Sequence, residues 1–368
     1  MGTVAGPEGP ITVYFGEAST EQRAQCYSLA GAEFGYPLSD DDYREREIYL
    51  GERPLTANGG CQYWCLFVEL ETGLTRVLAS CKTIRRQLLL ANATCGIWGG
   101  VGYCIASVVT DPQYRRMGLT SLLLQHLGDW MDRLGGATAS MLYSSIGNFY
   151  ERRGWKKKDC TLCVLTRIEV PLPKEVGLSL PQSFLLGRKD IPQLCDMDTT
   201  SVKDNFGHFA VRNDRTYLAV VPNVNTITWL HDRAEFISQK LFGRVPLHFG
   251  TKCNRIWMYW FHDFRKNQLA IQRVHIPMDS EPSDVSRELA AGLLDAIEEA
   301  RKWNFPKVIY WKDSQDLSAA VEFLVRRSDI VATKGERSKA RISVRWIGQS
   351  DEATDSVELP LEEFYAWN

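Results

Sequence analysis

The segment from Tyr103 to Leu134 constrains the fold more than any other part of the chain, because it joins a strand pattern directly to a helix pattern. Tyr103 to Thr110 is a short apolar run of the strand type, and Asp111-Pro112 ends it. From Leu119 to Leu134 apolar residues recur at intervals of three and four, which predicts an amphipathic helix that stops at Gly135-Gly136. A strand followed by such a helix indicates a sheet with a helix packed on its face.

The rest of the first half follows the same plan. Ser19 and Gln22 form a capping-box signature for a helix that runs to about Phe34. Further helices are predicted over 41–49 and 149–153, and strands over 11–16, 61–70, 75–90 and 139–143, with one more strand to follow. This order predicts an α/β fold built on a mixed (α+β) sheet with helices on its faces.

Prolines crowd the stretch between Val170 and Pro181, which indicates a junction between domains. A chain of 368 residues is also longer than one ordinary core supports. We therefore expect a first domain over 1–169, a linker over 170–182 and a second domain over 183–368. Beyond the linker, helices are predicted over 190–205 and 229–242. A hairpin, a long helix capped by Ser283, a strand and a short helix then recur in the order of the first half, which predicts that the second domain is a degenerate copy of the first.

Charge and cysteine usage narrow the function classes. The balance of 43 basic and 45 acidic residues argues against a nucleic-acid partner and against a polybasic membrane anchor. No apolar run is long enough to span a membrane and no secretory signal opens the chain, which indicates a cytoplasmic protein. The pairs Cys61/Cys65 and Cys160/Cys163 fall inside strand-like runs and lack the turn residues of a zinc knuckle, so we expect no metal.

The turn between strand and helix has the properties of an anion site. A helix N-terminus offers unpaired N–H groups and roughly half a positive charge. Gly118 lets the backbone approach a ligand closely, and Arg115 and Arg116 add charge-assisted hydrogen bonds. These are the requirements of a pyrophosphate cradle, although an ordinary strand-to-helix turn with solvated arginines would show the same residues.

Two sequence motifs resemble those of a known protein family. Arg115-x-x-Gly118-x-Thr120 resembles the Arg/Gln-x-x-Gly-x-Gly/Ala acetyl-CoA motif of GNAT acetyltransferases, with Thr120 as a departure. The segment from Asn148 to Trp155 looks like the second signature of that family, Asn-x-x-Phe-Tyr-x-x-x-Gly-Phe. The resemblance implies a GNAT-fold N-terminal domain followed by a degenerate GNAT-like C-terminal domain, with one site for acetyl-CoA or another acyl-CoA.

The resemblance also implies roles for individual residues. Tyr150 would be the catalytic residue, which donates a hydrogen bond to the thioester sulfur and a proton to the departing thiolate. The alternative is that Tyr150 is an amphipathic residue of the core. The edge of the strand at 107–109 would pair with the pantetheine arm. The residues expected to bind the cofactor are Ser107, Val108, Val109, Arg115, Arg116, Met117, Gly118, Leu119, Thr120, Asn148 and Phe149.

The general base is not assigned by the sequence. Many relatives carry a glutamate near the start of the fourth strand, but Tyr103 to Ser107 contains no carboxylate. His262 and Asp263 are candidates for the base, but the fold would have to bring them to the site. For each of them the alternative is an ordinary structural role. A water chain with a desolvated amine is the other possibility.

The whole chain is similar to the fungal lysine N-acetyltransferases of lysine catabolism and to related acyltransferases of specialised metabolism. The end of the chain, Glu363 to Asn368, is similar to the Tyr-Ala-Trp tail of that family, which usually finishes with cysteine. This resemblance implies a small-molecule amine or amino-acid-like acceptor, and no nucleic acid or membrane. O-acylation and a binding protein without turnover stay open, as does the oligomeric state. We expect the aromatic tail to be docked, either lining the acceptor pocket or plugging a core.

Overall fold

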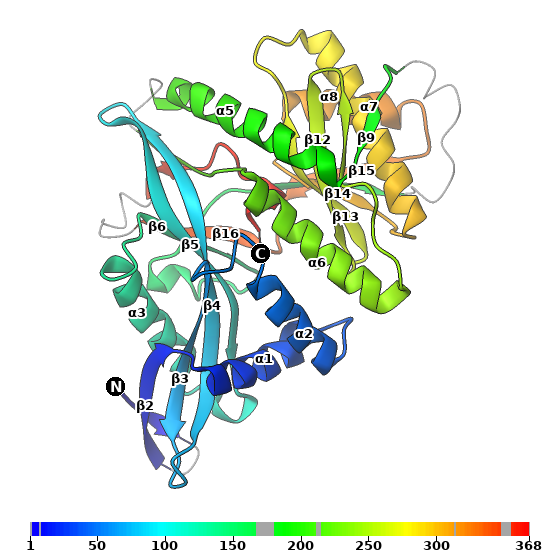
Figure 1. Ribbon diagram of the computed structural model, residues 1–368. Coiled ribbons are helices and arrows are strands. Elements are labelled where there is room, and N and C mark those ends of the chain that lie inside the picture. The colour runs from blue at the N-terminus through cyan, green and yellow to red at the C-terminus, as the bar shows by residue number, and fades with distance from the viewer. Residues whose placement is uncertain are drawn as a thin grey trace.

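Two β-sheets, one in each half of the molecule, organise the chain (Figure 1). The computed structural model describes residues 2–6, 9–166, 180–210, 215–312, 314–346 and 355–367. Most of the expected linker, 170–179, therefore lies outside the described residues, as does Asn368. None of the helices in the described ranges is long and apolar enough to cross a membrane.

The first sheet is mixed and is built around two long strands, β4 and β5. Its order is β1-β2-β3-β4-β5-β6-β16-β7, and β10 pairs with β4 and with β17. The strands are β1 (Gly2–Gly6), β2 (Gly9–Glu17), β3 (Cys61–Glu69), β4 (Thr75–Asn92), β5 (Gly96–Thr110), β6 (Ala139–Ser144), β7 (Lys156–Lys157), β10 (Thr216–Val220), β16 (Arg341–Trp346) and β17 (Val357–Glu358).

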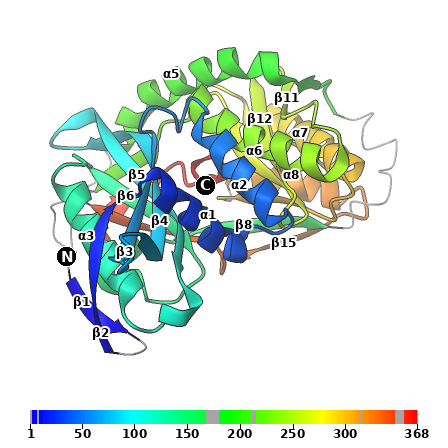
Figure 2. The same cartoon turned by 60° about the horizontal axis from the view of Figure 1, so that its bottom comes forward.

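Helices cover both faces of this sheet, as the alternation of side chains requires. On β3, Trp64 and Leu66 pack into the core beneath α3 (Leu119–Asp132). The neighbouring Tyr63 and Cys65 belong to the core beneath α1 (Thr20–Phe34), on the other face. Helix α2 (Asp40–Gly51) follows α1 and contacts α6 (Val224–Phe242) of the other half. The region where α2 meets α6 lies at the centre of the molecule (Figures 1 and 2).

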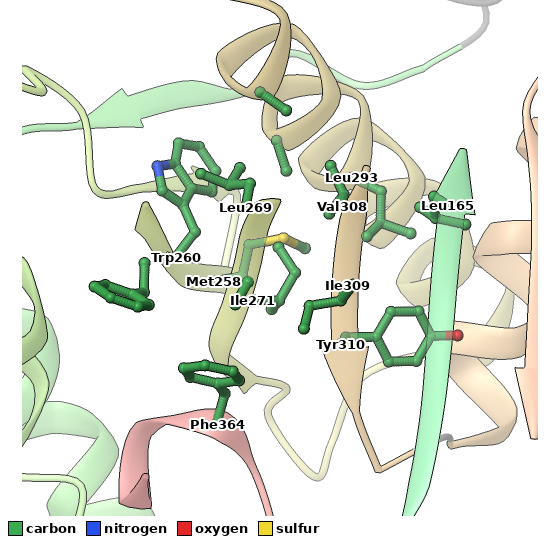
Figure 3. Packing of buried hydrophobic residues seen from close by; sticks show 14 of the residues in the cluster. Leu165, Met258, Trp260, Leu269, Ile271, Leu293, Val308, Ile309, Tyr310 and Phe364 are labelled. Atoms are coloured by element: carbon green, nitrogen blue, oxygen red, sulfur yellow. The ribbon is translucent and has the colours of Figure 1, made fainter. Parts of the chain in front are cut away.

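The second sheet has the order β15-β8-β14-β13-β12-β11-β9. Its strands are β8 (Thr161–Thr166), β9 (Phe184–Leu186), β11 (Gly250–Cys253), β12 (Ile256–Asp263), β13 (Gln268–His275), β14 (Val308–Trp311) and β15 (Val331–Glu336). The helices of this half are α5 (Ile191–Ala210), α6, α7 (Pro282–Lys302) and α8 (Gln315–Val325). Figure 3 shows the apolar core where α7 packs on the sheet, with Met258, Ile271, Leu293 and Val308 in contact range of one another.

The two halves exchange strands. β8, which precedes the expected boundary at residue 169, pairs with β14 and β15 in the second sheet. β16, close to the end of the chain, pairs with β6 and β7 in the first sheet. A further apolar cluster contains Leu88 and Cys104 of the first sheet together with Trp257 and Tyr259 of the second. The two sheets are therefore held together by strands as well as by a shared core.

The mixed sheets with helices packed on them agree with the expected fold class, and most of the predicted elements are found. The capping box at Ser19 and Gln22 is present at the start of α1. Three details of the helix predictions are wrong. α6 begins at Val224, after the cap residue Asn223, and not at residue 229. α3 ends at Asp132, and Leu134 is 88% exposed, because the chain turns at Arg133 and the N–H of Gly135 donates to the carbonyl of Trp130 at 2.8 Å. α7 is capped at Glu281, with Pro282 as its first residue, so Ser283 lies inside it.

The aromatic tail is docked, as expected. Residues 364–366 form the short helix η4, and Phe364, Tyr365 and Trp367 are all buried. The hydroxyl of Tyr365 donates to the carbonyl of Val220 at 2.6 Å. The partly buried carboxylate of Glu363, the first residue of the tail, accepts from the backbone N–H of Val274 at 2.9 Å and also pairs with Arg273. The tail is thus fixed between the two halves.

Candidate active site

The edge of β5 becomes free near the end of the strand. β5 runs parallel to β6 only as far as Ile105, opposite Leu142. Its pairing with β4 on the other side continues to Thr110. Among the described strands, none pairs with the edge of β5 that faces β6 from Ala106 to Thr110. A ligand that carries amide groups can pair with such an edge as an added strand would.

A β-bulge distorts β5 at the same point. The register between β4 and β5 shifts at Cys81, which lies opposite both Ser107 and Val108. Ser107 has φ of +51°, in the left-handed region, as a bulged residue can adopt. Ser107 and Val108 are half-buried and Val109 is buried. The three residues expected to meet the pantetheine arm therefore lie at the free edge, next to a local bend of the strand.

Helix α3 begins close to this edge with the geometry of an anion site. Gly118 is its N-cap residue, and its φ of +82° favours glycine. Within the described residues, the backbone N–H groups of Gly118, Leu119 and Thr120 donate to no protein acceptor. A hollow of about 290 Å³ adjoins them, and its lining is Thr110, Tyr114, Arg115, Arg116, Gly118, Leu119, Thr120, Ser121 and Phe149. These residues fit a diphosphate at the helix N-terminus. Met117 is half-buried in the same turn and does not line the hollow.

The two arginines of the turn differ in their surroundings. Arg115 forms an ion pair with Glu33 of α1, and its Nε also donates to the carbonyl of Thr110 at 3.4 Å. Arg116 is exposed and has φ of +67°. The hydroxyl of Thr120 lies 2.7 Å from the hydroxyl of Thr110. Thr120, which stands where the motif has glycine or alanine, is therefore accommodated by a hydrogen bond to Thr110 at the end of β5.

A third arginine at this helix end, Arg153, was not among the predicted site residues. Its guanidinium donates to the hydroxyl of Ser121, in the first turn of α3, and lies 3.8 Å above the ring of Phe149. A second hollow of about 670 Å³ shares Ser121 and Phe149 with the first and is also lined by Asn148, Arg152, Arg153 and Arg345. Arg153 belongs to the second sequence motif, so its charge was visible in the sequence. Arg345 comes from β16 and could not be anticipated, because it reaches the site only through strand exchange.

Tyr150 lies just before η2 (Glu151–Arg153) and is 8% exposed. Its ring packs in the core beneath α3 and makes an edge contact with Phe149, with 5.1 Å between the ring centres. Among the described residues its hydroxyl has no hydrogen-bond partner. Burial, with a further contribution from Cys81, raises the pKa of Tyr150 to about 12. Tyr150 shares its core cluster with Cys81, which lies opposite the bulge, and Val108 of β5 packs against the same cluster.

The residues weighed as a general base are already engaged. His262 is fully buried in β12, and its Nε2 lies 3.0 Å from Glu299. Asp263 is also buried, and it accepts from the Gln268 side chain at 3.1 Å and from the Lys266 backbone N–H at 3.2 Å. Their hydrogen bonds give both residues ordinary structural roles within the second half.

The charged group that the sequence reasoning missed is Glu47 of α2. Its carboxylate is buried and accepts from Lys82 at 2.6 Å, from Arg46 at 2.7 Å and from the hydroxyl of Tyr63 at 2.6 Å. Burial alone would raise the pKa of Glu47, but Lys82 and Arg46 together hold it below its ordinary value. So weakly basic a carboxylate is a poor proton acceptor. No local pattern marks it, because two of its three partners, Lys82 and Tyr63, lie on other elements.

Comparisons with known proteins agree with this geometry. A family model of the LYC1 GNAT-like C-terminal domain matches residues 168–368, and a model of the acetyltransferase (GNAT) domain matches residues 82–157. No curated protein matches the chain in sequence.

Solved structures share the fold at low identity. A GCN5-related N-acetyltransferase from Kribbella flavida is 15% identical, with a TM-score of 0.56 over 91% of this chain and 71% of that one. One from Anabaena variabilis is 15% identical, with a TM-score of 0.52 over 91% and 73%. Saccharomyces cerevisiae N-myristoyltransferase with bound myristoyl-CoA is 11% identical, with a TM-score of 0.51 over 91% and 79%.

The family match covers more than half of the chain. The chain therefore belongs to the family of the LYC1 GNAT-like C-terminal domain, and it is an N-acyltransferase of the GNAT superfamily that uses an acyl-CoA donor.

Proposed function

We propose that this enzyme transfers an acetyl group from acetyl-CoA to a primary amine of an amino-acid-like small molecule, with lysine as the first candidate. The observation that carries the proposal is the free edge of β5 from Ala106 to Thr110, which leads to the N-terminus of α3 and shares its core with Tyr150, whose hydroxyl has no partner among the described residues. The similarity to the fungal lysine enzymes supports lysine as acceptor. The division of the chain at residues 170–182 is part of the same proposal.

In this proposal the donor is held at two points. The diphosphate lies in the 290 Å³ hollow against the N–H groups of Gly118, Leu119 and Thr120, with Arg116 beside them. The pantetheine amides pair with the free edge at Ser107 to Val109. The larger hollow, with Arg152, Arg153 and Arg345 on its lining, suits the negatively charged nucleotide end of the molecule.

The chemical step needs a neutral amine. Its nitrogen lone pair forms a bond to the thioester carbon, and the carbon–sulfur bond breaks. Tyr150 donates a hydrogen bond to the sulfur and gives its proton to the thiolate, and it regains a proton through water from the nitrogen of the product. A pKa raised to about 12 keeps the phenol protonated at any working pH, so it always begins the step as a donor.

Deprotonation of the acceptor amine is the remaining free-energy cost of the reaction. With a pKa of about 10.4, roughly one lysine side chain in 10³ is neutral at pH 7, which corresponds to about 4 to 5 kcal/mol. Glu47, His262 and Asp263 are all occupied by other partners. We therefore propose that the amine loses its proton to water before it enters, and that the rate rises with pH until the amine itself has titrated.

The test is release of free thiol from acetyl-CoA in the presence of a panel of acceptors. We expect release with lysine or a related amino acid, and identification of the product by mass spectrometry as an amide. Release with an alcohol alone would replace the proposal by O-acylation. Binding of CoA without release for every member of a broad panel would overturn acetyl transfer to small amines.

A further inference from the structure

A third hollow, the β4 hollow, has a volume of about 820 Å³ and lies where β4 passes from one pairing partner to the next. β3 pairs with β4 as far as Ile84, and β10 pairs with it from Leu88 onward. Among the described strands, none pairs with this edge of β4 at residues 85–87, and all three residues line the hollow. Its other walls come from the segment 54–60, from β5, from α5 and from the start of α6. The β4 hollow shares no lining residue with the two hollows of the donor site.

The lining of the β4 hollow is cationic. Arg85, Arg86 and Lys203 belong to it, and none of the described residues that line it is acidic. Arg85 and Lys203 are exposed, whereas Arg86 is buried. The side-chain amides of Asn58 and Asn225 add hydrogen-bond donors to the same lining. Three positive charges without a compensating acid make this hollow attractive to an anion.

Two polar side chains of this lining are buried without partners. Arg86 is 1% exposed, and its Nε, Nη1 and Nη2 have no hydrogen-bond partner among the described residues. Burial lowers the pKa of Arg86, which reflects the cost of keeping its charge away from water. The hydroxyl of Thr199 on α5 is also buried and unpaired in the described part of the chain. Buried polar groups are nearly always paired, so this pair of exceptions in one hollow indicates a ligand that the protein is built to hold.

The N-terminus of α6 opens on the same hollow. Its cap residue Asn223 accepts from the backbone N–H of Thr226 at 2.9 Å and donates to the side chain of Gln87 on β4, also at 2.9 Å. The backbone N–H groups of Val224 and Asn225 donate to no protein acceptor within the described ranges. α6 has 19 residues, so its first turn carries the partial positive charge of a full helix. The helix end and the buried guanidinium therefore favour the same kind of ligand.

We infer that the β4 hollow binds the phosphate group of a phosphorylated small molecule. A phosphate monoester carries roughly 1.5 to 2 negative charges at pH 7, which matches three cations better than a single carboxylate does. Free N–H groups at a helix N-terminus, together with arginine and lysine, are the usual donors to phosphate. Apolar residues of the lining, such as Leu55 and Val221, can contact the rest of such a molecule.

The β4 hollow is a second site and not an extension of the acyl-transfer site. Val101 is the lining residue of β5 closest in sequence to its free edge, which begins at Ala106. Five residues of extended strand span roughly 17 Å. A ligand in the hollow therefore lies too far along the strand to share the thioester with the acceptor, and its binding does not depend on the proposed reaction.

The experiment titrates inorganic phosphate into the full chain by calorimetry at constant ionic strength, with acetate as the singly charged comparison. We expect saturable binding of phosphate whose Kd rises roughly 10- to 100-fold in Arg86→Met and about threefold to tenfold in Lys203→Gln. Two control variants should leave this Kd unchanged. Arg116→Ala alters the smaller donor hollow, and Lys189→Gln removes an exposed lysine that does not line the β4 hollow. Acetate should bind the wild type at least about tenfold more weakly than phosphate.

Thermal unfolding provides the folding control. Without phosphate, the Tm of Arg86→Met should equal or exceed that of the wild type, because an unpaired buried charge has been removed. Phosphate should raise the Tm of the wild type and of Lys189→Gln, and should raise that of Arg86→Met much less. If Arg86→Met does not fold, the exposed Lys203→Gln variant still decides the result.

The outcomes are independent of acyl transfer, because thiol release is not measured. Absence of saturable phosphate binding, or binding that only Arg116→Ala weakens, would overturn the site. An unchanged Kd in both Arg86→Met and Lys203→Gln would do the same. Acetate that binds as tightly as phosphate would overturn the assignment of a phosphate ligand.

Discussion

Tyr150→Phe removes one oxygen atom and leaves the aromatic ring in place. The ring accounts for the packing of Tyr150 against Phe149 and within the core beneath α3. The hydroxyl has no partner among the described residues, so its removal breaks no hydrogen bond of the folded protein. The structure therefore predicts a stability within about 0.5 kcal/mol of the wild type, the range of changes that touch no special feature.

The effect on catalysis should be much larger. A positioned acid contributes about 10²- to 10⁴-fold to a rate. Because the hydroxyl acts only on the departing sulfur, its loss should lower kcat by roughly 10²-fold and leave KM for acetyl-CoA nearly unchanged. Burial and then Cys81 raise the pKa of Tyr150 to about 12, so the wild-type rate should show no decrease from ionisation of Tyr150 up to about pH 10.

Three measurements on the same protein preparations test this reasoning. Steady-state thiol release gives kcat and KM, calorimetry gives the affinity for CoA, and thermal unfolding gives the change in stability. A variant with normal kcat and a Tm lowered by several degrees would refute the catalytic role and support the reading of Tyr150 as a core residue. Loss of CoA affinity with an unchanged kcat would also contradict the assignment.

Three further predictions concern the donor site and the buried charges. Gly118→Ala should weaken CoA binding by about fivefold to thirtyfold, since alanine at φ of +82° costs about 1 to 2 kcal/mol although its Cβ would meet no atom within 4 Å. An unchanged Kd in calorimetry would contradict this. Arg115→Ala should raise the Kd of CoA about threefold to tenfold. Glu33→Gln should not raise the Kd, because this change only releases Arg115 from an exposed ion pair. Weaker binding of CoA in both variants would show that the ion pair itself forms the site. Glu47→Gln leaves Lys82 without its counter-charge and should cost about 3 to 5 kcal/mol at pH 7 by thermal or denaturant unfolding. The pKa of Glu47 is depressed in the folded state, so this contribution is complete above the unfolded carboxyl pKa and is lost progressively as pH falls from there toward the lower folded pKa. A difference that is as large at pH 3 as at pH 7 would argue against the ion pairs as its source.

Local patterns in the sequence determined the elements of the donor site. The apolar period of Leu119 to Asp132 forms α3, and glycine at position 118 permits the left-handed turn that opens its N-terminus. The two motifs were therefore sufficient to identify the family and to name six of the nine residues that line the smaller hollow; Thr110, Tyr114 and Ser121 were not among them. Such features depend on residues within one or two turns of each other, and a linear sequence displays them directly.

The partners of the charged groups were decided only by tertiary structure. The ion pair between Arg115 and Glu33, the contact of Arg153 with the start of α3, and the contact of Arg233 with Trp367 all join elements far apart in the chain. The exchange of β8 and β16 between the sheets is of the same kind, since an edge strand pairs through backbone groups that every residue carries. Sequence period thus decides which face of an element is buried, whereas the fold decides which buried charge is left without a partner.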